Sequence, residues 1–174
     1  MFVSFRAVTY ATCFIGFLLI YLPARMLSWA GISRPAAIAW PQLTGISIGC
    51  AGAMVTLWCI TTFVGKGRGT PAPFDPPRKL VIQGPYQFVR NPMYMGAALA
   101  LAGAACFYKS AALLAYDLIF LVASHLFVIG YEEPTLRRTF GHEYEAYCHR
   151  IRRWRPRLRA VSQEQITHPA RRSL

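Results

Sequence analysis

Residues 43–64 read LTGISIGCAGAMVTLWCITTFV, which is 22 residues without one charged side chain. A helix needs about 20 apolar residues to cross a bilayer core of about 30 Å. This run is therefore long enough to cross a membrane as a single helix. It predicts an integral membrane protein, and the segments around it extend that prediction.

Three further apolar segments share this character. They run from Ala7 to Leu22, from Met93 to Tyr108 and from Ala111 to Tyr131. Only two residues, at 109 and 110, separate the last two segments, which predicts a tight transmembrane hairpin. The sequence therefore predicts an all-α fold, a multi-pass transmembrane helical bundle with four membrane segments.

The first segment has two interpretations. It spans a bilayer if Pro23 kinks the helix without ending it, because apolar residues then continue to Ala30. It is a secretory signal peptide if Arg6 belongs to a positively charged leader. Apolar residues extend beyond any suitable cleavage position, which favours the membrane helix.

The composition agrees with a membrane protein. The 174 residues are 55% hydrophobic and 15% charged, the mean hydropathy is +0.32 and the net charge is +12. Such an apolar chain is not disordered, and it lacks the charged surface of a soluble domain. Its basic residues lie between the apolar runs, where they would meet anionic lipid headgroups, so we expect no nucleic-acid partner. The five cysteines include no CxxC pair, so we expect neither a disulfide framework nor a metal site.

The distribution of basic residues predicts an orientation. With the N-terminus inside and four crossings, 16 of the 19 Lys and Arg residues lie on the cytoplasmic side. This follows the positive-inside rule. Both termini are then cytoplasmic, and the loop 65–91 lies on the same face as the region after Glu132.

The C-terminal region carries one apolar stripe at helical spacing. Its members are Phe140, Tyr144, Tyr147, Ile151, Trp154 and Leu158. Arginines flank the stripe, which predicts an interfacial amphipathic helix in the headgroup layer, ending near Trp154 or Arg155 because Pro156 follows. A solvated basic tail is the alternative. We therefore expect one membrane domain over residues 1–159 and a polar, disordered tail over 160–174.

A helix start precedes the third segment. Asparagine is favoured at the N-cap and proline at the first helical position, so Asn91 and Pro92 mark this start. The free N–H groups and Arg90 make the start electropositive, while Tyr86 and Tyr94 add aromatic faces. The arrangement predicts either a simple capped helix or a pocket for a ligand with a carboxylate and an aromatic or cationic group.

The fourth segment supplies acidic groups. Glu132 and Glu133 lie at its inner end, and Asp117, His125 and Glu132 fall within roughly 80° of one another on a helix. A polar stripe in a membrane faces a partner helix or a cavity. Asp117 and His125 either form structural hydrogen bonds or face a substrate.

Three groups of residues, taken together, resemble a known superfamily. They are the run from Leu80 to Gly96 (LVxxGPYxxVRNPMYxG), the pair Glu132-Glu133, and FGxEYxxY from Phe140 to Tyr147. This combination resembles the isoprenylcysteine carboxyl methyltransferase and phospholipid methyltransferase superfamily. The resemblance covers about Arg78 to Pro156.

The resemblance implies an integral membrane methyltransferase that uses S-adenosyl-L-methionine at a non-Rossmann site, open sideways to lipid at the cytosolic face. The implied substrate is lipidic or partitions into the membrane. Carried over by position, the cofactor would contact Leu80, Val81, Tyr86, Asn91, Pro92, Met93, Tyr94 and Glu132. Arg90 suits the cofactor carboxylate.

Two positions depart from the family pattern. Asn91 replaces a common histidine and cannot act as a titrating base. Val128 replaces an arginine that carboxyl methyltransferases link to the substrate carboxylate. We expect O-methylation of a carboxylate; N-methylation of a phosphatidylethanolamine-type amine and a non-catalytic lipid-binding role remain alternatives. An amine or thiol would need a proton acceptor, for which Glu133, Asp117 and His125 are the candidates.

Overall fold

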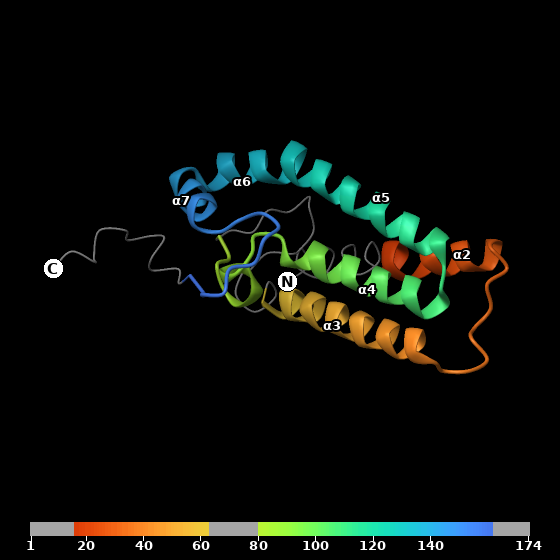
Figure 1. Cartoon of the computed structure of the whole chain (residues 1–174). Helices are drawn as coiled ribbons and strands as arrows, with labels where there is room; N and C mark the ends of the chain where they lie inside the picture. The colour runs from red at the N-terminus through yellow and green to blue at the C-terminus, as the bar shows by residue number, and fades with distance from the viewer. Residues whose placement is uncertain (1–15, 63–79, 162–174) are drawn as a thin grey trace, which may run out of the picture.

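The computed structural model describes residues 16–62 and 80–161, and helices dominate both ranges (Figure 1). No β-strand occurs within these ranges, so the all-α prediction is confirmed for them. The helical elements are η1 (Phe17–Tyr21), α2 (Leu22–Trp29), α3 (Trp40–Thr62), η3 (Gly84–Gln87), α4 (Pro92–Tyr108), α5 (Ala111–Phe127), η4 (Val128–Glu132), α6 (Glu133–Phe140) and α7 (His142–Arg150).

Within the described ranges, two helical stretches are long and apolar enough to cross a bilayer. They are α3 and the continuous stretch Ala111–Phe140, which joins α5, η4 and α6. The stretch Phe17–Trp29 and helix α4 are apolar but shorter. Four crossings and a transmembrane hairpin therefore stay predictions.

Two prolines lie inside continuous helical stretches. Pro23 is the second residue of α2 and Pro134 the second residue of α6, and a five-residue π-helix precedes each helix. Proline has no backbone N–H to donate, so the regular hydrogen bonding of an α-helix is interrupted there. A π-helical turn before the proline is one way in which the helix continues past this interruption. The fourth segment consequently continues beyond Tyr131 to Phe140 and does not end at its acidic pair.

Glycines bring α3 and α4 into backbone contact. A Cβ added at Gly52 would lie 2.4 Å from the nitrogen of Ala100, and one added at Gly103 would lie 2.4 Å from the nitrogen of Gly49. Small residues allow such close approach between helices in lipid. Gly45 faces Gly103 and Gly52 faces Gly96, so the two helices run antiparallel (Figure 1). The end of α3 therefore lies beside the start of α4.

The connection between α4 and α5 is as short as predicted. Lys109 adopts a left-handed backbone with φ of 50° and ends α4. The Ser110 side chain then accepts a hydrogen bond from the Leu113 nitrogen and caps α5. This two-residue turn places α5 against α4.

The predicted single amphipathic helix to Trp154 is wrong in its extent. Gly141, with φ of 49°, separates α6 from α7, and α7 ends at Arg150. Part of the apolar stripe packs inward: Tyr144, Tyr147 and Ile151 join a buried cluster with Leu80, Ile82 and Val161, whereas Leu158 is fully exposed. Val161 thus packs with the fold two residues beyond the predicted boundary at 159. We call residues 151–161 the C-terminal strap.

Candidate functional site

The C-terminal strap lies on the loop that precedes α4. The backbone nitrogen of Arg90 donates to the carbonyl of Arg152 over 3.1 Å. Farther along, the nitrogen of Arg157 donates to the carbonyl of Phe88 over 3.0 Å. These bonds hold the strap at the N-terminal end of α4, beside α6.

Glu133 is bound by two arginines. Arg153 donates from Nε and Nη2 to the two carboxylate oxygens, at 2.7 and 2.9 Å, and Arg90 Nη1 lies 3.2 Å from Oε1. The Glu133 side chain is only 8% exposed. Bidentate pairs of this kind fix geometry as well as charge. Two guanidinium groups on one carboxylate leave a local excess of positive charge.

The Arg90 side chain is 11% exposed, and one of its donors is buried and unused among the described residues. Its Nη1 donates to the Cys148 sulfur at 2.7 Å, but its Nε is buried and has no hydrogen-bond partner among the described residues. A buried donor without a partner costs about 1–3 kcal/mol. An anionic ligand group at this position would remove that cost.

The predicted start of α4 is confirmed, with a different use of the N-cap side chain. Asn91 occupies the N-cap position and Pro92 the first turn, but the Asn91 side chain caps nothing. Its Nδ2 donates instead to the carbonyl of Arg153 over 3.3 Å. The side chain at the N-cap thus leaves the first N–H groups of α4 uncapped, next to Arg90.

Tyr94 and Glu132 meet across the two helical stretches. The Tyr94 hydroxyl donates to Glu132 Oε2 over 3.0 Å. The start of α4 and the acidic residues of the last long stretch therefore lie together, as the sequence predicted. Tyr94 and Glu132 are at the same end of the bundle as Arg90, which precedes α4, and Glu133, which follows Glu132.

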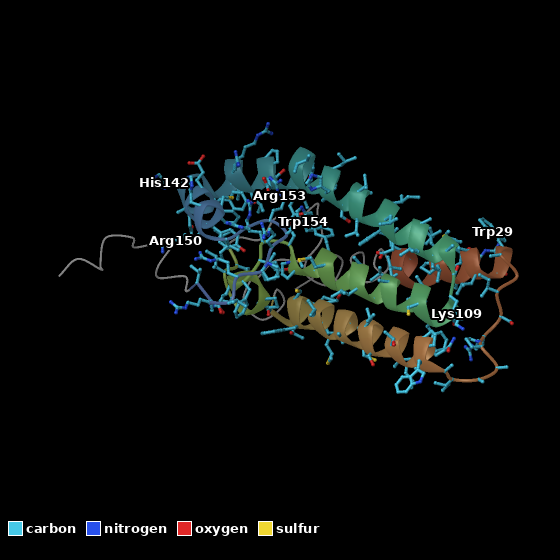
Figure 2. The ribbon with its side chains drawn as sticks, viewed as in Figure 1. Trp29, Lys109, His142, Arg150, Arg153 and Trp154 are labelled. Atoms are coloured by element: carbon cyan, nitrogen blue, oxygen red, sulfur yellow. The ribbon has the colours of Figure 1, made fainter. Side chains whose placement is uncertain are left out.

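Trp154 reaches this group from the strap. Its indole Nε1 donates to His125 Nδ1 over 3.0 Å, and its ring stands edge-on to Tyr94 at a centroid distance of 6.5 Å. Figure 2 shows Arg153 and Trp154 at the end of the bundle opposite Trp29 and Lys109. Sequence reasoning placed Trp154 in an interfacial stripe and missed this position. No local signal identifies it, because the contact depends on how the strap folds back.

Leu80, Val81 and Tyr86 support the loop through packing. Leu80 belongs to the cluster around α7, whereas Val81 and Tyr86 pack with Cys59 of α3. The Tyr147 hydroxyl donates to the carbonyl of Tyr86 over 2.8 Å. Burial raises the pKa of Tyr147 well above its usual range, so this donor stays protonated at neutral pH. Cofactor contacts by these loop residues stay predictions.

The polar residues of the predicted stripe lie at different depths along the helix. His125 is joined to Trp154, but Asp117 lies 15 residues before Glu132, roughly 22 Å deeper at 1.5 Å per residue. Asp117 is 4% exposed, and its Oδ1 has no partner among the described residues. Its predicted role as a proton acceptor stays a prediction, and it requires a substrate group that reaches far into the bundle.

Comparison with known proteins places this geometry in a family. The model of the phospholipid methyltransferase family matches residues 40–143, more than half of the chain. The chain belongs to the phospholipid methyltransferase family. No curated protein and no solved structure gave a significant match.

Family membership makes this chain a methyltransferase of a membrane family. The matched residues of the phospholipid methyltransferase include Arg90, Tyr94, Glu132 and Glu133, so the contacts among these side chains lie inside the shared region. The match ends before the strap. Arg153 and Trp154 are thus contributions to the site from outside the matched region.

Proposed function

We propose that this phospholipid methyltransferase uses S-adenosyl-L-methionine and acts on a lipidic substrate beside the start of α4. One observation carries the proposal. The Tyr94–Glu132 hydrogen bond lies at the helix start that also holds Arg90 with its unused buried donor. A donor for a carboxylate, an acceptor for an amine or hydroxyl, and aromatic faces are thus gathered at one place.

These groups fit the cofactor chemically. S-Adenosyl-L-methionine supplies an electrophilic methyl group on a sulfonium. Arg90 and the uncapped N–H groups of α4 suit its carboxylate. Glu132 suits its amino group or ribose hydroxyls, and the rings of Tyr94 and Trp154 suit a cation. Asn91, Pro92 and Met93 line the helix start around them.

The nucleophile that the site favours is a carboxylate. Glu133 is occupied by two arginines, and Glu132 accepts from Tyr94. His125 Nδ1 must accept from Trp154, because an indole N–H can only donate, so the proton of a neutral ring is on Nε2. A carboxylate substrate needs no proton acceptor, which supports O-methylation. Expulsion of water also favours a reaction in which opposite charges disappear.

N-methylation of a phospholipid amine is the second candidate. The matched family is that of phospholipid methyltransferases, and buried Val128 cannot pair with a substrate carboxylate as an arginine would. In that reaction the amine nitrogen must lose a proton. His125, Asp117 or Glu133 would then accept this proton. His125 would first have to release Trp154, and Glu133 would have to release an arginine.

One experiment separates these functions. The purified protein in detergent is incubated with methyl-labelled S-adenosyl-L-methionine and a membrane lipid extract. A methyl ester would release labelled methanol in base, whereas an N-methyl headgroup would retain the label. Cofactor binding without transfer to any lipid would contradict both reactions and support the non-catalytic alternative.

Glu132→Ala is expected to weaken cofactor binding by about 10-fold or more, because a hydrogen bond to a charged group contributes about 1.5–3 kcal/mol. Isothermal calorimetry measures this loss. Glu145→Ala, on the exposed side of α7, is the matched control and should bind as the parent does. Equal affinities of Glu132→Ala and the parent would remove Glu132 from the cofactor site.

Trp154→Phe is expected to weaken cofactor binding by roughly 5-fold, and Trp154→Ala by more. Phenylalanine retains an aromatic face but cannot donate to His125, and a neutral hydrogen bond contributes about 1 kcal/mol. The same calorimetric titration measures both variants. Trp29→Phe, at the opposite end of the bundle, is the control. Unchanged affinity in Trp154→Ala would contradict the role of this ring.

A further inference from the structure

A basic hollow is lined by the end of α7 and the C-terminal strap. Its volume is about 600 Å³, within the range of small-molecule sites. Five arginines line it, and Leu158 lies among them: Arg150, Arg152, Arg155, Arg157 and Arg159. We call this feature the arginine hollow.

The arginine hollow has no acidic counterpart in the described ranges. The ion pairs there join Glu133 to Arg90 and Arg153, and neither of these arginines lines the hollow. Four of the five lining arginines are exposed, and Arg150 is partly buried. Like charges gathered around one concave surface repel one another, so an anion would stabilise the arrangement.

The arginine hollow is separate from the methyl-transfer site. Along the strap, the partly buried Arg153 and Trp154 contact Glu133 and His125. Their neighbours Arg152 and Arg155 are exposed and line the hollow. One short segment therefore presents different side chains to two sites.

The position of the hollow suggests what occupies it. Figure 2 shows Arg150 at the same end of the bundle as Trp154, opposite Trp29 and Lys109. That end lies at the level of lipid headgroups if the long helices span the bilayer. Leu158, an apolar side chain that is fully exposed, suits contact with acyl chains there.

We propose that the arginine hollow binds the phosphate of an anionic phospholipid, with Leu158 beside the acyl chains. Guanidinium groups bind phosphate oxygens in bidentate geometry, and basic residues next to a membrane are attracted to anionic lipids. The lipid in this site is a resident ligand, distinct from the lipid that is methylated. The proposal does not depend on which reaction the methyltransferase performs.

The test is a lipid titration of the purified full-length protein by native mass spectrometry in detergent. Phosphatidylglycerol and phosphatidylcholine of equal chain length are the two probes. We expect the parent to retain phosphatidylglycerol preferentially. Arg152→Gln/Arg155→Gln should reduce that preference by roughly 10-fold or more, because each basic residue near an anionic surface contributes about 1 kcal/mol. Both side chains are exposed and neither donates a hydrogen bond to another described residue, so the fold should persist.

The matched control is Arg137→Gln/Arg138→Gln. These two arginines are exposed on α6, at the same end of the bundle, and do not line the hollow. The control should keep the parent's preference. Equal loss in both variants would show that general surface charge attracts the lipid and would overturn the proposal. Equal retention of the two lipids by the parent would also overturn the proposal. Displacement of phosphatidylglycerol by 10-fold excess inorganic phosphate or by a short oligonucleotide would overturn it too.

Discussion

Gly52→Ala is expected to lower the thermal unfolding temperature of the protein in detergent by roughly 5–10 °C. The added methyl group would lie 2.4 Å from the backbone nitrogen of Ala100 and 2.5 Å from the carbonyl oxygen of Gly96. Backbone atoms of a packed helix cannot move aside as a flexible side chain can. The two helices must therefore separate along their length, which costs more than the gain of about 1 kcal/mol in helix propensity.

Gly49→Ala is the control for this effect. Gly49 lies on the same helix, but the nearest described atom that a Cβ there would meet outside this helix is the Cα of Gly103, at 4.0 Å. Alanine should fit at this position and slightly stabilise α3. A thermal scan that showed the same decrease for both variants would mean that close α3–α4 contact does not determine stability.

Glu133→Gln is expected to have the second large effect, a loss of stability of about 3 kcal/mol together with loss of cofactor binding. Removing one partner of a buried ion pair costs about 3–5 kcal/mol, because a buried charge remains unpaired. Here that charge is mainly Arg90, whose side chain is 11% exposed, whereas Arg153 is 31% exposed and can turn towards water. The lower end of the range therefore applies.

The same variant distinguishes a positioning role of Glu133 from the predicted role as a proton acceptor. A positioning residue holds Arg90 and Arg153, so its loss should weaken cofactor affinity as well as turnover. Calorimetry and single-turnover methyl transfer, measured on the same preparation, report the two quantities separately. Glu145→Gln, which is exposed on α7, should change neither. Normal affinity with abolished turnover would contradict the positioning role and favour proton transfer.

Features that depend on local sequence could be predicted. The start of α4 follows from the Asn91-Pro92 pair, and the end of α4 and the start of α5 follow from the short polar break at residues 109–110. The contact between Tyr94 and Glu132 is also predicted, because the sequence places the start of the third segment and the inner end of the fourth segment at the same membrane face. Periodicity and capping determine such features with little influence from the rest of the fold.

Features that depend on tertiary packing could not be predicted. The stripe from Phe140 to Leu158 has the spacing of one helix, but Gly141 interrupts it and Ile151 is extended. The buried cluster with Leu80 gains more from packing these side chains inward than a longer helix would provide. Spacing also gave no sign that Glu133 would be occupied by two arginines, since Arg153 approaches it only after the chain reverses.

The position of the strap along the chain has a consequence for biosynthesis. Helices α3 to α6 precede Arg153 and Trp154 in the chain, so these helices are synthesised before the site has two of its side chains. A nascent chain that has not yet released the strap should therefore be inactive. Catalytic competence would begin only after residue 161 has emerged, when Val161 and Ile151 can pack beneath α7.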